Sequence, residues 1–311
     1  MTEFQLIELL TSKLKINDNR VIVGFGDDCA GVKLDDTILL FSNDIQVENV
    51  HFILDKINPQ DLGWKLISVN VSDVVACGGK PQWCNISIGI PNYISIDYLE
   101  GIYTGINEAL QFYKFNLIGG NTSKSKELIL DLFITGTTDR FVSRFSVEKG
   151  DTILLSGYTG LSRAGLELLL MNKEKYEDFE LKLIKYHTRP TARLDLVEII
   201  NKKANACIDI SDGLAGDIAH MLERNKLGAL IENLPIHPLL EKFCKKYNKN
   251  PIDYILYGGE DYQLVFTVKE DELENLPKNI FKIGKIIGEK GIFYKKNGKI
   301  VKLKERGFSH L

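Results

Sequence analysis

The sequence predicts a mixed α and β protein of two domains, and three observations lead to this prediction. Strand-like apolar runs alternate along the whole chain with stretches whose apolar residues recur every three or four positions. The chain has 311 residues, which is long for a single hydrophobic core. A polar break at 146–150 precedes a new strand pattern from Thr152. We therefore place the boundary near 145–150, with domains at 1–147 and 148–311.

In the first half, helices are expected where apolar residues follow a period of 3.6, and strands where short apolar runs end in turn-forming residues. The spacing over 60–77 places Asp73 on the apolar stripe of a helix. Gly119-Gly120-Asn121 has the composition of a turn between two strands. The elements expected here are a helix at 3–15, a strand at 37–41, helices at 60–77 and 97–112, and strands at 116–118 and 128–137.

The second half continues this alternation, with no internal repeat of 20–50 residues. A charged stretch at 172–186 is expected to be solvated. The string at 208–214, Ile-Asp-Ile-Ser-Asp-Gly-Leu, lies where a strand meets a helix, so its Ser and Asp residues fit helix capping as well as phosphate and metal binding. The elements expected here are a strand from 152, helices at 162–171 and 190–203, a strand at 206–210, a helix at 213–225 and a strand at 262–268.

Composition and charge argue against several classes of function. The net charge is −3 and no basic patch with interleaved aromatic residues occurs, so nucleic acid is not an expected partner. No apolar run approaches the roughly 20 residues of a membrane span, and the acidic start lacks a signal-peptide pattern, so we expect a cytoplasmic protein without membrane contact. The five cysteines form no Cys-x-x-Cys pair, which disfavours a disulfide framework or a zinc site.

Aspartates that interrupt apolar or glycine-rich strings are the strongest functional signal. A carboxylate in such a setting loses hydration unless a cation or hydrogen-bond donors replace the water. No matching set of Lys or Arg lies in these strings, and oxygen ligands favour a hard ion such as Mg²⁺. Because Mg²⁺ is usually shared with substrate phosphates, a polyphosphate substrate is expected. The acids are Asp27, Asp28, Asp44, Asp73, Asp209 and Asp212.

Most of these strings also have an ordinary structural explanation. Asp27-Asp28 and Ser42-Asn43-Asp44 follow strand-like runs, and turns at such places are rich in Asp and Asn. Asp73 is harder to explain in this way, because a carboxylate on an apolar helix face needs a partner. The P-loop is absent, and Gly24-Phe-Gly26 lacks the third glycine of the dinucleotide fingerprint. A nucleotide enzyme with this sequence would use another scaffold.

Taken together, the motifs resemble those of the thiamine-monophosphate kinase family. That family shares its fold with aminoimidazole-ribonucleotide synthetase, selenophosphate synthetase and the hydrogenase-maturation dehydratase. The resemblance covers essentially the whole chain. The matching strings are, in order, Gly26-Asp-Asp-Cys-Ala, Asp44 with His51-Phe52, Val69-Asn-Val-Ser-Asp73, Gly119-Gly-Asn, His187-Thr-Arg-Pro-Thr-Ala-Arg193, Ile208-Asp-Ile-Ser-Asp-Gly-Leu, Gly258-Gly-Glu-Asp-Tyr-Gln-Leu and Gly307-Phe-Ser-His.

The resemblance implies phosphorylation of thiamine monophosphate to thiamine diphosphate, the last step of thiamine diphosphate biosynthesis, with ATP as donor and several Mg²⁺ ions per site. It also implies a homodimer whose amino-terminal sheets join into a β-barrel, with active sites near the subunit interface, and a carboxy-terminal α/β sandwich. Because the acceptor phosphate is itself a nucleophile, direct in-line transfer is expected, with positioning and charge stabilisation supplying most of the catalysis.

Roles for individual residues follow from the same resemblance. The metal-associated positions are Asp28, Ser42, Asn43, Asp44, Asp73, Asn121, Asp209 and Asp212. The aspartates among them are expected to be essential for catalysis. The nucleotide-contacting positions are Tyr103, Gly120, Asn121, Arg144 and Ser211. The positions on the thiamine-phosphate side are His51, Glu260 and Phe308. Many relatives have Asp where this chain has Asn121, so metal binding there is expected to be weaker.

Two other interpretations stay open. A synthetase of the same fold is one, although selenophosphate synthetase would be expected to carry a reactive Cys near the amino terminus, and no Cys precedes Cys29. The chain also ends Phe-Ser-His-Leu, without the terminal Cys of the hydrogenase-maturation relative. A nucleotide-binding regulator that has lost turnover is the other, and Asn121 is the residue that suggests it.

Overall fold

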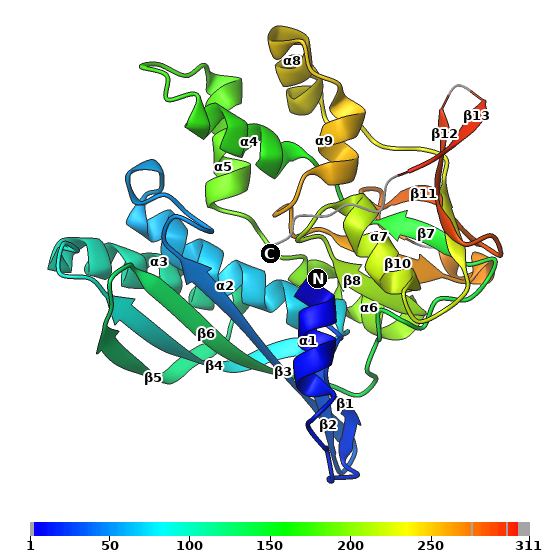
Figure 1. Ribbon diagram of the computed structural model, residues 1–311, viewed down its shortest axis with the longest axis horizontal. Coiled ribbons are helices and arrows are strands. Elements are labelled where there is room, and N and C mark those ends of the chain that lie inside the picture. The colour runs from blue at the N-terminus through cyan, green and yellow to red at the C-terminus, as the bar shows by residue number, and fades with distance from the viewer. Residues whose placement is uncertain (1–2, 275, 297, 304–311) are drawn as a thin grey trace.

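The computed structural model describes residues 3–274, 276–296 and 298–303, and it contains a separate sheet in each half of the chain (Figure 1). From edge to edge, the six-stranded sheet consists of β1 (Val21–Val23), β2 (Ala30–Leu34), β3 (Thr37–Val47), β6 (Ile129–Thr138), β4 (Lys80–Ile90) and β5 (Asn116–Lys124). The seven-stranded sheet consists of β13 (Lys299–Lys302), β12 (Gly291–Lys296), β9 (Gly228–Ile231), β11 (Phe281–Ile287), β7 (Thr152–Leu155), β10 (Leu264–Val268) and β8 (Ala206–Asp209). The mixed α and β fold class is confirmed.

The helix α2 (Pro59–Ala76) lies at the centre of the molecule. Asn58 caps its first turn by accepting a hydrogen bond from the Gln60 backbone N–H at 2.9 Å, and Pro59 suits the first helical position. The helix packs on β3 and β6 on one side and on β8 of the other sheet on the other. It is therefore buried along almost its whole length from Asp61 to Ala76.

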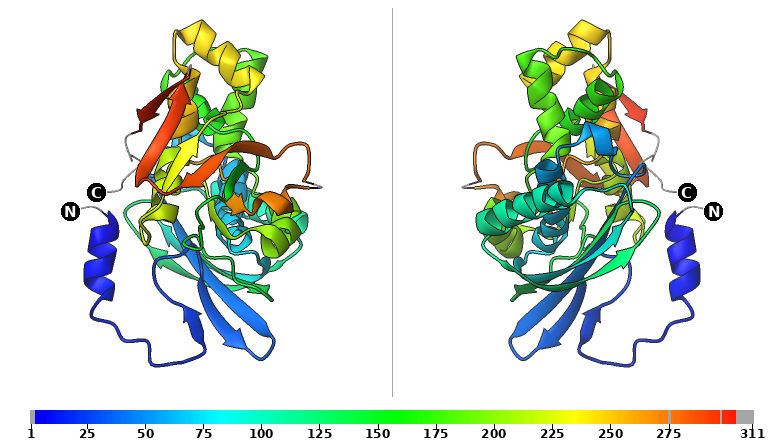
Figure 2. Two further views of the ribbon diagram at one scale, coloured as in Figure 1. Left: turned by 90° about the vertical axis from the view of Figure 1, so that its right-hand side faces the viewer. Right: turned by 90° about the vertical axis from the view of Figure 1, so that its left-hand side faces the viewer.

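Smaller helices flank this centre. The first half also contains α1 (Glu3–Thr11), a 3-10 turn η1 (Leu54–Lys56) and α3 (Ile96–Tyr113), which packs beside α2. In the second half, α4 (Leu161–Leu170), α5 (Asp178–Thr188), α8 (Pro238–Tyr247) and α9 (Pro251–Tyr257) form a group at one end of the molecule (Figures 1 and 2). The remaining helices are η2 (Leu194–Leu196), α6 (Val197–Lys203), α7 (Leu214–Leu222) and η3 (Glu270–Leu273).

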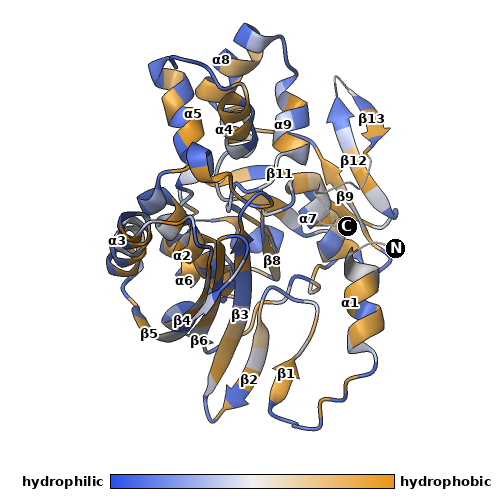
Figure 3. Cartoon of the chain, turned by 60° about the vertical axis from the view of Figure 1, so that its left-hand side comes forward, coloured by the Kyte–Doolittle hydropathy of each residue, from blue (hydrophilic) through white to orange (hydrophobic). Residues whose placement is uncertain are grey.

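Apolar residues recur along the strands of the first sheet (Figure 3). One buried apolar cluster includes residues of both halves, such as Val71 of α2 and Phe266 of β10. The two halves therefore pack through a shared interior, and a fixed geometry between them is expected. Within the described ranges, every helix falls short of the length and apolar character needed to cross a membrane.

Most of the predicted elements are present within a few residues of their expected bounds, but two expectations are wrong. The charged stretch at 172–186 is mostly exposed, as expected, but it also contains most of α5, which had not been predicted; Glu177 and Glu180 form its capping box and Leu183 packs into the core. The turn at 119–121 is absent, since β5 runs through it while pairing with β4. Likewise β3 continues to Val47, so Ser42-Asn43-Asp44 lies inside a strand and not at its end.

Several elements had not been predicted. These are β2 and β4 in the first half, and α8, α9, β9 and β11 to β13 in the region after 225. Two of these helices begin with Pro after a capping His or Asn side chain, a start signal that is visible in the sequence.

Candidate active site

A cleft of about 1120 Å³ lies between the two halves, with walls from β3, α2, α4, α5 and the loop that joins β8 to α7. It brings together residues that are far apart in the sequence. The predicted site residues that line it are Asp28, Ser42, Asn43, Asp44, His51, Asp73, Arg144, Asp209, Ser211, Asp212 and Glu260.

Three carboxylates form the acidic centre of the cleft. Asp28, Asp73 and Asp209 each place an oxygen within 4.8 Å of the other two. The hydroxyl of Ser42 donates a hydrogen bond to Asp73 Oδ2 at 2.5 Å. Asp28 Oδ2 is buried and accepts no hydrogen bond from the described residues. A buried carboxylate oxygen without a donor needs a cation, so this oxygen-only group could hold a divalent ion such as Mg²⁺.

The protonation of these acids supports the same conclusion. Burial, followed by repulsion from Asp44 and Asp209, raises the pKa of Asp73 well above its ordinary value. Burial also raises the pKa of Asp209 to about 7, with a further contribution from Asp44. Without a metal these groups compete for protons, and a bound divalent cation would favour the ionised forms.

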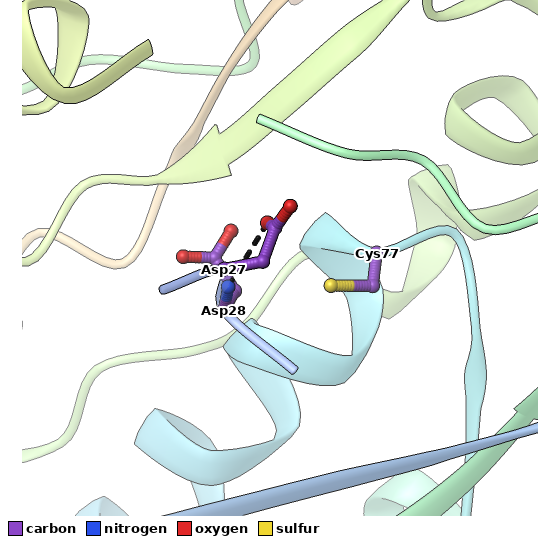
Figure 4. A group of neighbouring side chains, drawn as sticks. All are labelled: Asp27, Asp28 and Cys77. Atoms are coloured by element: carbon purple, nitrogen blue, oxygen red, sulfur yellow. Dashed lines mark hydrogen bonds between the residues drawn. The ribbon is translucent and has the colours of Figure 1, made fainter. Parts of the chain in front are cut away.

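The strand β1 leads into Asp27-Asp28, which lies beside Cys77 (Figure 4) and also beside Arg144. Arg144 Nη2 is 3.0 Å from Asp28 Oδ1, whereas Asp27 accepts hydrogen bonds from Ser143 Oγ at 2.5 Å and from the Asp28 N–H at 3.0 Å. Burial raises the pKa of the Cys77 thiol well above its usual value. Cys77 is therefore a neutral neighbour, and the carboxylates are the better metal ligands.

The turn from β8 into α7 supplies the next group of acids. Gly213 has φ of 116°, a backbone conformation that favours glycine, and it follows Asp212 directly. Asp212, Asp217 and His220 place ligand atoms within 4.8 Å of one another. Burial opposes protonation of His220, but hydrogen bonds to Asp212 and Glu223 raise its pKa to about 9. The sequence reasoning missed Asp217 and His220, although Asp217 interrupts an apolar helix as Asp73 does.

Glu260 lines the cleft from the loop that follows α9. Lys65 Nζ is 2.6 Å from Glu260 Oε1, and His187 Nδ1 is 3.4 Å from Oε2. His51, which also lines the cleft, accepts a hydrogen bond from the Val47 N–H through Nδ1 at 3.0 Å. Lys65 and His187 were not predicted as site residues, although His187 belongs to one of the matching strings.

Other predicted residues lie elsewhere. Tyr103 on α3 is 43% exposed, and Gly120 and Asn121 are exposed on the edge strand β5, outside the cleft. Asp44 and Gly120 belong to one row of residues that crosses the sheet from β3 through β6 and β4 to β5. Three strand spacings separate them by roughly 14 Å. Within one subunit, Asn121 therefore cannot share a metal ion with Asp44.

Two further positions need comment. The Asn43 side chain donates to Asp131 Oδ1 at 2.6 Å, on the face of the sheet opposite Ser42 and Asp44. Alternation along a strand explains this, because successive side chains point to opposite faces. Phe308 lies outside the described residues.

Comparison with known proteins adds independent findings. Residues 26–138 match the AIR synthase related protein N-terminal domain, and 148–296 match the corresponding C-terminal domain. The thiamine-monophosphate kinase of Aquifex aeolicus (strain VF5) is 46% identical over 310 residues, covering 99% of this chain and 97% of the relative. The thiamine-monophosphate kinase of Escherichia coli (strain K12) is 32% identical over 323 residues, covering 99% and 98%. A solved structure of AaThiL complexed with AMPPCP and TMP has a TM-score of 0.92 and 44% identity, covering 100% of this chain and 97% of the other.

Proposed function

The chain belongs to the AIR synthase related proteins and, among them, to the thiamine-monophosphate kinase family, and from this premise we propose that it transfers the γ-phosphate of ATP to thiamine monophosphate. The observation that carries the proposal is the acidic centre formed by Asp28, Asp73 and Asp209 in an interdomain cleft. Such a group suits a reaction between two phosphate-bearing substrates better than it suits an uncharged ligand.

Different residues of the cleft fit the metal ions, the nucleotide phosphates and the acceptor substrate. Mg²⁺ bound at the acidic centre would offset the repulsion between donor and acceptor phosphates, about 4 kcal/mol per charge pair at 4 Å and an effective dielectric of 20. Ser211 precedes α7, whose amino-terminal N–H groups favour an anion. Arg144 lies at the same end and fits the nucleotide phosphates. Glu260 and His51, which also line the cleft, fit the thiamine side of the acceptor.

We expect direct in-line transfer, without a phosphorylated enzyme. The acceptor phosphate is a nucleophile, and catalysis then requires positioning more than a protein nucleophile. The thiols that lie nearest, Cys29 and Cys77, are buried, and burial raises their pKa values. The check is brief exposure to γ-labelled ATP followed by denaturation. Label that stays covalently attached to the washed protein would contradict direct transfer.

A homodimer would bring Tyr103, Gly120 and Asn121 to a second subunit's cleft. The strand β5 is an exposed sheet edge, and such edges are usually covered or paired. One face of the same sheet carries Ile45 and Trp83, which are 43% and 46% exposed. An apolar face beside an open edge fits a partner sheet, as in a barrel formed by two subunits.

The proposed function is tested by a coupled assay with ATP, Mg²⁺ and thiamine monophosphate. ADP and thiamine diphosphate should form in equal amounts, the latter measured by fluorescence after oxidation to thiochrome. EDTA should abolish both products, and excess Mg²⁺ should restore them, because the acids cannot hold the phosphates without a cation. Binding of ATP with no product at saturating Mg²⁺ would favour a regulator or a sister synthetase instead.

A further inference from the structure

We propose that Lys65 is a positioning residue for the acceptor substrate, holding the Glu260 carboxylate ionised and directed into the cleft. This inference rests on the proposed function and extends it. It assigns to Lys65, which itself lies outside the cleft lining, control over how tightly the thiamine end of the acceptor is bound.

Lys65 is an unusual residue at its position. It lies in the middle of α2 and is among the largest fully buried side chains of the described chain. Its side chain is 1% exposed, and Lys is almost never buried to this extent without a partner. Among the described residues, the ion pair with Glu260 is its one charged contact, and Nζ has no hydrogen-bond acceptor in good geometry. The buried ammonium group therefore depends on Glu260 for the neutralisation of its charge.

Glu260 lies between Lys65 and the cleft, where its carboxylate can contact a ligand. Its side chain is 27% exposed and lines the cleft, in contrast to Lys65 behind it. Burial by itself would raise the pKa of Glu260, but Lys65 and then His187 hold it below its ordinary value. A carboxylate has about four lone-pair sites, so one ion pair leaves others to accept hydrogen bonds. The ligand class that fits is an amino-substituted or cationic heterocycle.

The backbone around Glu260 is held in an uncommon conformation. Glu260 and Tyr262 have φ of 60° and 49°, in the left-handed region that is unfavourable for both residue types. Their N–H groups donate to Ser211 O at 2.7 Å and Ile210 O at 3.0 Å. Strained residues held by their surroundings are frequent at ligand sites. The loop is thus fixed against the turn that carries the acidic residues.

His187 does not supply the positive charge itself. Burial, with a contribution from Lys65, lowers the pKa of His187 to about 4, against the influence of Glu260. The ring is therefore neutral at pH 7, and its Nδ1 is also 3.1 Å from the Ser162 hydroxyl. Lys65 therefore provides the main positive charge beside Glu260, with a smaller contribution from His51.

A purely structural role is the alternative, because Lys65 and Glu260 join the two halves of the chain. Lys185 offers a control outside the cleft. Its Nζ is 2.7 Å from Asp61 Oδ1, which also joins α5 to α2, but neither residue lines the cleft. Arg189 Nη1 is also 3.2 Å from Asp61 Oδ1, so Lys185→Met weakens a contact between the halves without leaving Asp61 unpaired.

The test compares Lys65→Met, Glu260→Gln, the double variant and Lys185→Met in the coupled assay. Lys65→Met and Glu260→Gln should each raise KM for thiamine monophosphate roughly tenfold or more, as for a lost hydrogen bond to a charged group. KM for ATP should stay within about twofold, and Lys185→Met should change neither constant. The double variant should resemble Glu260→Gln alone, because Lys65 acts through Glu260.

Several outcomes would overturn the inference. Equal changes in both KM values would indicate loosening, and multiplied effects in the double variant would show independent roles. If Lys65→Met does not fold, Glu260→Gln is compared with the double variant: KM should not rise further, and thermal stability should recover, because a buried unpaired ammonium has been removed. A further rise in KM would reject the proposal. An inactive wild-type enzyme would overturn the proposed function and this inference together, whereas an active one with unchanged KM in Lys65→Met overturns this inference alone.

Discussion

Replacing Asp73 by Asn is expected to lower kcat on the order of 10³-fold while leaving the fold intact. The side chains are nearly equal in shape, so packing around α2 should not change. The charge is lost at the centre of the acidic group, where Asp73 faces Asp28 and Asp209 within 4.8 Å. An amide oxygen can still approach a cation but brings no negative charge. Steady-state kinetics at increasing Mg²⁺ concentrations measure the loss.

The stability of the same variant separates a metal-site role from a structural one. Because burial and the neighbouring acids raise the pKa of Asp73 well above its ordinary value, the folded protein binds that proton more tightly than the unfolded chain. The ionised form therefore costs stability above the unfolded pKa of about 4, including at pH 7. Metal-free Asp73→Asn should be at least as stable as wild type, whereas Mg²⁺ should raise Tm more in wild type.

Asp36→Asn serves as the control, since Asp36 is exposed in the turn between β2 and β3. It should leave both kcat and the effect of Mg²⁺ on Tm unchanged. Wild-type turnover by Asp73→Asn at saturating Mg²⁺ would remove Asp73 from the metal site. A large loss of stability in the metal-free variant would assign it a structural role instead.

The sequence allowed Asp73 to be predicted because its signal is local. Apolar residues spaced for a helix surround it, and a charge within such a pattern requires a partner whatever the rest of the fold does. Lys65 gives the same signal eight residues earlier, between Trp64 and Leu66, and it was missed. Its partner Glu260 is 195 positions away, and no periodicity connects the two. The pairing depends on how the halves pack, which local patterns do not encode.

The wrong turn at 119–121 has a different physical cause. Gly-Gly-Asn is favourable for a turn in isolation, but tertiary pairing with β4 determines the outcome. An added Cβ at Gly120 would lie 2.2 Å from the Ile86 carbonyl oxygen, so glycine serves close strand approach here and not chain reversal. The strand predicted at 37–41 was too short for a related reason, since the polar string Ser42-Asn43-Asp44 resembles a strand end. Both motifs are functional candidates, which explains their locally unfavourable composition.

Mixing two inactive variants is expected to restore about a quarter of wild-type activity if each site uses both subunits. One variant is Asp73→Asn, and the other combines Tyr103→Ala with Asn121→Ala, which should lower activity on the order of 10²-fold through lost nucleotide and metal contacts. In a two-fold symmetric dimer, each mixed pair has one site with every side chain intact and one with both defects. Random exchange makes half of the dimers mixed, so a quarter of all sites are intact.

The reason to expect this result is the distance within one chain. Asn121 is separated from Asp44 by three strand spacings, roughly 14 Å, which no single Mg²⁺ can bridge with ligand distances of about 2.1 Å. A partner subunit placed against β5 could bring a second Asn121 to the cleft. Unfolding and refolding the variants together allows exchange, and refolding each alone is the control. If the mixture is no more active than its components, while sedimentation shows a dimer, Asn121 acts outside a shared site. A monomer with full activity would reject the dimer as well.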